Sequence, residues 1–160
     1  MDIEHNLKNE LREGMGLPQG SLYLMTEIVR YREKRLSSLL SQQGISLHEW
    51  RALRILYSYK GKVAMSELIA HSQTDRTALG RTINQLVKRG WVERFQDPDD
   101  KRAFFLYVTE VSQVTFAKVW HLVADFDKEL LNSINENEQS LLKQILNQMM
   151  LSIDAYEKSE

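Results

Sequence analysis

The stretch "RFQDPDDKRAFFLYV", residues 94–108, constrains the fold of this chain more than any other. Two runs rich in aromatic and β-branched residues, "WVERFQ" and "AFFLYV", flank a charged segment that contains Asp97, Pro98, Asp99 and Asp100. Proline presets one backbone φ angle and aspartate bonds local backbone, so this segment is typical of a turn. Two strand-like runs joined by a few turn residues predict a β-hairpin.

Most of the remaining chain follows the periodicity of amphipathic helices. A long helix is predicted from about residue 18 to 43, where Gly44 would end it, and a shorter amphipathic piece precedes it. The apolar residues of that piece are Ile3, Leu7 and Leu11. "SLHE" predicts a capping box between Ser46 and Glu49, at the start of a helix that would stop at Gly61.

Further helices surround the hairpin. "SELIAHS" predicts a short helix, and "TDRTALGRTINQLVKRG" predicts a longer one that ends at Gly90. After the hairpin, Thr109 can cap a helix to about Ser133, and "NENE" offers an Asn-x-x-Glu start for a last helix to about Tyr156. A short helix, a turn, a second helix and a two-stranded hairpin together form the layout of a winged helix-turn-helix.

The predicted fold class is therefore mainly α with a small β-hairpin wing. We expect a winged helix-turn-helix module over residues 44–109, flanked by dimerisation helices over residues 1–43 and 110–160. The last helix carries an apolar stripe whose width is typical of packing against more than one neighbour, as in an intersubunit bundle. The stripe consists of Leu141, Leu142, Ile145, Leu146, Met149, Met150 and Ile153. It predicts a homodimer.

Composition excludes several classes of protein. The chain of 160 residues is 42% hydrophobic, enough to build the core of one ordinary domain. It has no cysteine, which excludes disulfides and cysteine nucleophiles, and a reducing cytoplasm is the expected compartment. No apolar run is long enough to span a membrane, and the acidic N-terminus is unlike a signal peptide.

Signatures of enzymes and metal sites are missing from the sequence. It contains no phosphate loop, no Gly-x-Ser-x-Gly elbow and no dinucleotide fingerprint, so no catalytic residue and no cofactor is expected. The histidines lack the spacing of metal ligands: His5, His48, His71 and His121. The expected protein is not an enzyme.

Charge is distributed unevenly along the chain. The net charge is −1, but residues 76–102 carry seven basic and four acidic side chains, whereas the others carry fourteen basic and eighteen acidic ones. The positive field is therefore local, around the hairpin and the helix before it. Such a field favours a polyanionic partner at this part of the molecule.

The helix before the hairpin separates into two faces when 100° is assigned to each residue. Its apolar face consists of Leu79, Ile83, Leu86 and Val87. Its polar face consists of Thr77, Arg81, Asn84 and Lys88, with Gly80 on the flank and Arg76 in the first turn. In a major groove, Arg can bond guanine, Asn can bond adenine, and Thr can contact phosphate or the thymine methyl group. Any surface helix has a polar face, but this one has no acidic residue after Asp75, which favours DNA binding.

The hairpin turn supplies the other candidate DNA contacts, Asp100, Lys101 and Arg102. A wing that reaches past such a helix meets the phosphate backbone or the minor groove, and a narrow minor groove attracts arginine. Asp100 can hold the Arg102 guanidinium through a bidentate pair, while Asp97 and Asp99 shape the turn. The alternative is an ordinary solvated loop.

Residues 66–110 resemble the core of the MarR family of bacterial transcription regulators. The resemblance depends on the start Ser66-Glu67-Leu68, the "KRGWVER" segment, and the Asp-x-Arg wing followed seven residues later by Thr109. It is strongest over about residues 46–110, and the order of flanking helices extends it to nearly the whole chain. Two departures affect loop detail: Ser72-Gln73 replaces a more usual apolar turn, and the usual glycine after the wing is missing.

The resemblance implies an obligate homodimer joined through its terminal helices, with two winged modules on successive major grooves of a palindromic double-stranded operator. It also implies control of transcription, usually repression, by a small molecule or by oxidation. The absence of cysteine excludes the thiol-oxidation branch. The expected location is the cytoplasm, at the nucleoid when the protein is bound to DNA.

Effectors in this family often occupy the crevice between the dimer helices and the DNA-binding module. Candidate residues there combine aromatic rings and arginines suited to an aromatic carboxylate. They are Tyr23, Arg30, His48, Trp50, Arg51, Arg54 and Tyr57. The alternative, which is favoured, is that Trp50, Leu53 and Tyr57 belong to the core and that the arginines are solvated.

Two hypotheses of different classes remain at this point. The first is a ligand-responsive, sequence-specific DNA-binding repressor. The second is a helical protein–protein interaction module that uses the winged helix as a scaffold without reading DNA sequence. The basic tract and the polar face of the helix over residues 74–89 favour the first.

Overall fold

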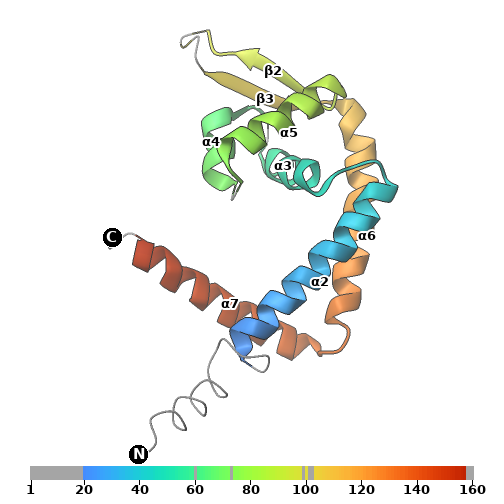
Figure 1. The fold of residues 1–160 in the computed structure, drawn as a ribbon, viewed down its shortest axis with the longest axis vertical. Coiled ribbons are helices and arrows are strands. Elements are labelled where there is room, and N and C mark those ends of the chain that lie inside the picture. Colours follow the sequence, from blue (N-terminus) through green and yellow to red (C-terminus); the bar gives the residue numbers. More distant parts are fainter. Residues whose placement is uncertain (1–19, 60, 73, 99, 101–102, 158–160) are drawn as a thin grey trace, which may run out of the picture. The chain divides into compact units, whose positions relative to one another are not determined.

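The structure is a computed structural model that describes residues 20–59, 61–72, 74–98, 100 and 103–157. It divides into two compact units, of which the first extends to Val119 and the second begins at Trp120. Figure 1 labels most of the helices and strands described below. The prediction of a mainly helical chain with a small β-hairpin wing is confirmed. The amphipathic piece predicted around Ile3 lies outside the described residues.

The first unit begins with helices α2, Ser21–Gln42, and α3, Leu47–Ser58. Gly44 follows α2 at a φ of 70°, a left-handed conformation that glycine adopts without steric cost, as expected for a helix end. The predicted capping box of α3 is confirmed, because Glu49 N donates to Ser46 Oγ and Ser46 N donates to the Glu49 carboxylate. The helix stops at Ser58 and not at Gly61, since Tyr59 already has extended backbone angles.

The helix-turn-helix consists of α4, Met65–His71, and α5, Arg76–Lys88. The hairpin consists of β2, Val92–Gln96, and β3, Phe104–Val108, which pair antiparallel. A third strand that the sequence did not predict, β1, Val63–Ala64, pairs with β3 and gives the sheet order β1-β3-β2. Two residues are too short a run to show the alternation by which a strand is recognised.

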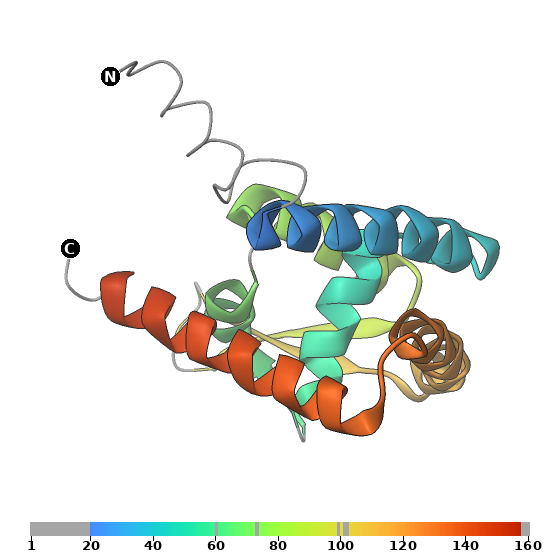
Figure 2. The same ribbon diagram turned by 90° about the horizontal axis from the view of Figure 1, so that it is seen from below.

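Helix α3 lies at the centre of the first unit, in contact with α2, α4, α5 and β3 (Figures 1 and 2). Its buried face consists of Glu49, Trp50, Ala52, Leu53 and Leu56. Leu36 and Leu40 of α2 and Leu106 of β3 are also fully buried. Burying an apolar side chain of this size stabilises a fold by about 1.5–3 kcal/mol, so these contacts hold α5 and the wing on a rigid base.

Helix α6, Glu110–Leu131, begins in the first unit and ends in the second. Thr109 caps it as predicted, because Ser112 N donates to Thr109 Oγ1. The second unit also contains α7, Glu136–Glu157, whose predicted Asn-x-x-Glu start is confirmed by reciprocal hydrogen bonds between Asn135 and Glu138. Large apolar side chains are exposed along α7: Leu141, Leu142, Ile145, Leu146, Met150, Leu151, Ile153 and Tyr156.

Candidate nucleic-acid interface

Helix α5 begins at a cap made by Asp75. Its carboxylate accepts hydrogen bonds from the amides of Thr77 and Ala78, at 3.1 and 2.9 Å. These bonds, first that from Ala78 and then that from Thr77, lower the pKa of Asp75. Aspartate at this position also suits the positive end of the helix dipole. The one acidic residue of this segment therefore fixes the start of the helix.

The two faces of α5 are those that the sequence predicts. Leu79, Ile83 and Leu86 are buried against the module, and Val87 is partly buried. The opposite face is exposed and consists of Arg76, Thr77, Arg81, Asn84 and Lys88. An exposed row of hydrogen-bonding and cationic side chains on one helix is compatible with insertion into a major groove. A Cβ atom added at Gly80 would meet no other atom within 4 Å, so the flank of the helix is open there.

Arg94 of β2 adds a side chain to this surface that was not among the candidates predicted from the sequence. Its guanidinium lies 3.4 Å from Asn84 Oδ1 and stacks on the ring of Phe104, 3.7 Å from the centroid. Strand alternation could have found it, because Arg94 shares a face of β2 with the buried Val92 and therefore points to the side where α5 packs.

Arg89, at the end of α5, is engaged within the protein. Its Nη1 atom donates to Glu49 Oε1 at 3.0 Å, and its guanidinium stacks 3.7 Å from the centre of the Trp91 ring. Glu49 is buried, with a side chain only 8% exposed. Arg89, one of the seven basic residues between positions 76 and 102, therefore holds α5 against α3.

The wing turn is closed by backbone hydrogen bonds. Asp97 N donates to Ala103 O at 3.0 Å, and Ala103 N donates to Asp100 O at 2.9 Å. Asp100 is exposed, while Lys101 and Arg102 lie outside the described residues. The predicted pair between Asp100 and Arg102 therefore stays a prediction.

Thr109 fixes the base of the wing. Its hydroxyl donates to Gly90 O at 2.7 Å, and its amide donates to Trp91 O at 3.0 Å. The end of α5, the start of β2 and the start of α6 therefore meet at one residue. This arrangement positions the hairpin relative to α5.

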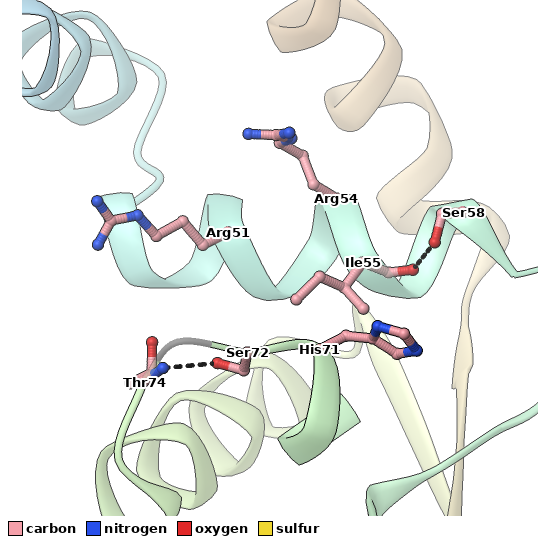
Figure 3. A pocket seen from close by; sticks show the side chains of 7 residues that line it. All are labelled: Arg51, Arg54, Ile55, Ser58, His71, Ser72 and Thr74. Atoms are coloured by element: carbon pink, nitrogen blue, oxygen red, sulfur yellow. Dashed lines mark hydrogen bonds between the residues drawn. The ribbon is translucent and has the colours of Figure 1, made fainter. Parts of the chain in front are cut away.

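A cleft of about 520 Å³ lies between α3 and the turn that leads into α5 (Figure 3). It is lined by Arg51, Arg54, Ile55, Ser58, His71, Ser72 and Thr74. Arg51 and Arg54 extend from α3 in different directions, while Ile55 lies on the side of α3 that faces His71 (Figure 3). Within the described part of the chain Arg54 has no ion-pair partner, whereas Arg51 bonds Glu33 of α2.

The structure places the other candidate effector residues elsewhere. Trp50 is fully buried and stacks on Phe116, so it is a core residue and not part of an open cleft. Tyr57 also stacks on Phe116, at 3.8 Å, and its hydroxyl lies 2.7 Å from Ser112 Oγ. Burial raises the pKa of Tyr57, which keeps it neutral.

The remaining candidates are surface residues. His48 is exposed at the start of α3, and Tyr23 is partly buried on α2. Arg30, also on α2, pairs with Glu27 at 2.6 Å. Of the seven candidates, Arg51 and Arg54 are the two that line the cleft. The other residues on the second side of the cleft, His71, Ser72 and Thr74, were not predicted from the sequence. They belong to the end of α4 and the turn after it, and the periodicity of α3 carries no information about them.

Metal ligands and membrane spans are both missing from the described residues. These contain no group of three or more histidine or acidic side chains arranged to hold a metal ion. They also contain no helix with the length and apolar character needed to cross a bilayer.

Comparison with known proteins relates this geometry to a family. The MarR family profile matches residues 45–104, which include α3, α4, α5 and the hairpin up to the start of β3. The HTH-type transcriptional regulator BilQ of Clostridium symbiosum (strain WAL-14163) is 30% identical over 122 residues, covering 74% of this chain and 82% of that protein. The transcriptional repressor MprA of Escherichia coli (strain K12) is 26% identical over 161 residues, covering 98% of this chain and 91% of MprA.

A solved structure shares the fold. A MarR mutant from Escherichia coli complexed with operator DNA superposes with a TM-score of 0.71 at 23% identity, covering 93% of this chain and 99% of that one. The relatives are transcriptional regulators, and the matched segment contains the exposed row of α5. This chain belongs to the MarR family of winged helix-turn-helix, DNA-binding transcription regulators.

Proposed function

We propose that this protein is a dimeric, sequence-specific repressor whose affinity for its operator is lowered by a small anionic effector. The observation that carries the proposal is the exposed row on α5, in which Thr77, Arg81, Asn84 and Lys88 lie opposite a buried apolar face. The row combines side chains that read base edges with cations that contact phosphate. The wing, with Asp100, Lys101 and Arg102, adds contacts to the adjacent backbone or minor groove.

Sequence similarity supports repression as the mode of control. MprA, which aligns with nearly the whole of this chain, is a transcriptional repressor. A regulator that binds tightly to double-stranded DNA at a promoter lowers transcription by occupying it. We therefore assign DNA binding to residues 44–109 and dimerisation to the helices on either side.

The apolar surface of α7 supports a homodimer. Leu141, Ile145 and Ile153 are each exposed in a single protomer, and they belong to the stripe recognised in the sequence. Exposed apolar stripes of this length are typical of helices that pack against a second chain. A twofold dimer would present two α5 helices to two half-sites of a palindromic operator.

The dimer is tested by sedimentation equilibrium at micromolar concentration. Ile145→Glu places a charge on the stripe and should give monomers, because a buried unpaired carboxylate is costly. Gln144→Glu adds the same charge to a neighbouring exposed position of α7 and should leave the dimer intact. A wild-type protein that sediments as a monomer would contradict the proposal.

The cleft between α3 and the turn before α5 supports effector control. The two arginines in its lining suit a carboxylate, and its lining also includes the turn in which Thr74 N donates to Ser72 Oγ at 3.1 Å. A ligand that contacts this turn would change the position of α5, which begins at Arg76. Repression would then be relieved, because binding of α5 depends on its register in the groove.

The function is tested by fluorescence anisotropy with DNA fragments from the promoters of the protein's own gene and its neighbours. One fragment should bind far more tightly than a scrambled fragment at the same salt concentration, since the expected specificity ratio is about 10³ or more. Equal affinity for both fragments would support the protein–protein scaffold instead. A separate titration of benzoate into the specific DNA complex tests the effector. Benzoate should lower the affinity for DNA if a small carboxylate relieves repression.

A further inference from the structure

The hairpin has a second face, on the side opposite the buried Val92 and Leu106. In the antiparallel pairing of β2 and β3, Glu93 lies opposite Tyr107 and Phe95 lies opposite Phe105. Paired residues share a face of the sheet, so these four side chains form one surface, the outer wing face. The other face carries Val92 and Leu106, which are buried against the module.

Aromatic side chains are exposed on the outer wing face. Phe95 is 51% exposed and Tyr107 is 36% exposed, and their rings meet edge to face with centroids 5.3 Å apart. Val111, in the first turn of α6, is 68% exposed and continues this apolar surface. Large apolar side chains that gather on a surface in this way mark an interaction site more often than isolated ones do.

A cleft of about 590 Å³ lies at this surface. It is lined by Glu93, Phe95, Tyr107, Val108, Thr109, Glu110 and Val111. The two charged side chains in this lining, Glu93 and Glu110, are both carboxylates. They would repel the phosphates of DNA, so the cleft is unsuited to the partner of α5 and suited to a cation.

The same sheet already holds cations against its rings. On the outer wing face, the Lys62 ammonium lies 4.1 Å from the centre of the Phe105 ring. On the opposite face, the Arg94 guanidinium stacks on Phe104. The negative face of an aromatic ring attracts a cation, most strongly where the cation is weakly hydrated. The exposed rings of Phe95 and Tyr107 offer the same chemistry to a ligand.

We propose that the cleft formed by Glu93, Phe95, Tyr107, Glu110 and Val111 is a binding site for an organic ammonium cation with an apolar body. The two carboxylates supply the countercharge, the aromatic pair contacts the methyl or methylene groups around the nitrogen, and Val111 extends the apolar wall. This site is separate from the cleft beside Arg54, which suits an anion. It does not depend on the proposed operator or effector.

The test uses the full-length protein without DNA and follows its backbone amide resonances by NMR. The probe is choline, and the comparison is its neutral isostere dimethylbutanol, in which carbon replaces the charged nitrogen. Choline should shift the amides of Phe95, Tyr107 and Val111 and bind about fivefold or more tightly than the isostere, given the strength of exposed cation–π and ion-pair contacts. Equal affinity of the two compounds, or shifts that lie elsewhere, would overturn the proposal.

Variants separate the two sources of affinity. Glu93→Gln and Glu110→Gln should each weaken choline binding about two- to threefold and leave dimethylbutanol binding unchanged. Phe95→Leu keeps an apolar side chain but removes the ring, and should weaken choline binding about two- to fivefold. Glu129→Gln, at an exposed position farther along α6, is the matched control and should have no effect. Choline affinity that is the same in Phe95→Leu as in the wild type would exclude the aromatic contact and the site with it.

Discussion

The Arg89 guanidinium donates to the buried Glu49 carboxylate at 3.0 Å, and this bond joins the end of α5 to the start of α3. Glu49 also closes the capping box of α3 by accepting from Ser46 N at 2.8 Å. The Glu49 carboxylate therefore bonds two separate segments, the loop before α3 and the end of α5. Because 40 residues separate the partners in sequence, the bond is a tertiary constraint on the angle at which α5 projects.

This relationship predicts a pH-dependent stability. Burial by itself would raise the pKa of Glu49, but the hydrogen bonds from Ser46 and Arg89 outweigh it and lower the pKa below the ordinary value of 4.5. A carboxylate with a lowered pKa stabilises the fold above that ordinary value, and its contribution is lost as the pH falls through the folded-state pKa. Glu49→Gln should reduce the free energy of unfolding by about 1–3 kcal/mol at neutral pH, and by less at acidic pH.

Urea denaturation at fixed protein concentration, from neutral pH to about pH 3, measures this difference. Glu67→Gln is the matched control, because Glu67 accepts from Ala64 N at 2.9 Å in the same way but is exposed at the start of α4. Glu67→Gln should therefore reduce the free energy of unfolding by less than Glu49→Gln does. A Glu49→Gln penalty that is constant across the pH range would contradict the role assigned to the charge.

The row on α5 predicts a loss of sequence discrimination. Arg81→Ala and Asn84→Ala should each weaken binding to the specific site by about 1–3 kcal/mol and relax the preference for it, as expected for base-edge contacts. Lys88→Ala should weaken binding evenly across sequences and reduce its salt dependence. Anisotropy titrations on specific and scrambled DNA measure both quantities. Lys118→Ala, at an exposed position of α6, is the control and should change neither quantity. If the α5 variants discriminate between specific and scrambled DNA as well as the wild type does, α5 does not read the DNA sequence.

Arg94 is predicted to act together with Asn84. Its guanidinium bonds the same carboxamide oxygen that would accept from an adenine amino group, so it orients that amide and adds a cation at the groove edge. Arg94→Ala should weaken operator binding, and a double-mutant cycle with Asn84→Ala should show a coupling of about 0.5 kcal/mol or more. Strictly additive losses would mean that Arg94 contacts DNA, if at all, independently of Asn84.

The wing motif predicts a second coupled pair, Asp100 and Arg102. Arg102→Ala should weaken binding and reduce any preference for A·T-rich flanks, because it removes a cation from a narrow minor groove. Asp100→Ala should also weaken binding, although removing a negative charge near DNA would by simple electrostatics strengthen it. The double mutant should lose little more than Arg102→Ala alone. Tighter binding by Asp100→Ala, measured on the specific site at fixed salt, would rule out a positioning role.

The cleft beside α3 predicts that Arg54 governs the response to a carboxylate. Benzoate should weaken the specific DNA complex of the wild-type protein, and Arg54→Gln should raise the concentration needed by about two- to fivefold, as expected for an exposed ion pair. Arg35→Gln, which removes an exposed arginine of α2, should leave the response as it is. The measurement is the affinity for the specific DNA as a function of benzoate concentration. If Arg54→Gln and Arg35→Gln respond equally to benzoate, the effector does not bind beside Arg54.

Local structure and family membership could be predicted from the sequence alone. The capping boxes at Ser46 and Asn135 are contacts between residues three apart, so both helix starts could be read from the chain. The two faces of α5 follow from helical periodicity, and the hairpin follows from turn chemistry between two strand-like runs. These features depend on neighbours in sequence, and the structure confirms them.

The roles of several similar residues became clear only from the way the chain packs in three dimensions. Strand β1 exists because Val63 and Ala64 meet β3 some forty residues later, and two residues alone carry no strand signal. Arg89 and Arg94 are equivalent in the sequence, yet one bonds a buried carboxylate and the other reaches the exposed face of α5. By its type and position Trp50 could be an effector residue or, as the sequence favours, a core residue, and the structure shows its ring in the core. In each case the role depends on a partner that is distant in the sequence. Periodicity and motif spacing describe only neighbouring residues, so they cannot predict such long-range contacts.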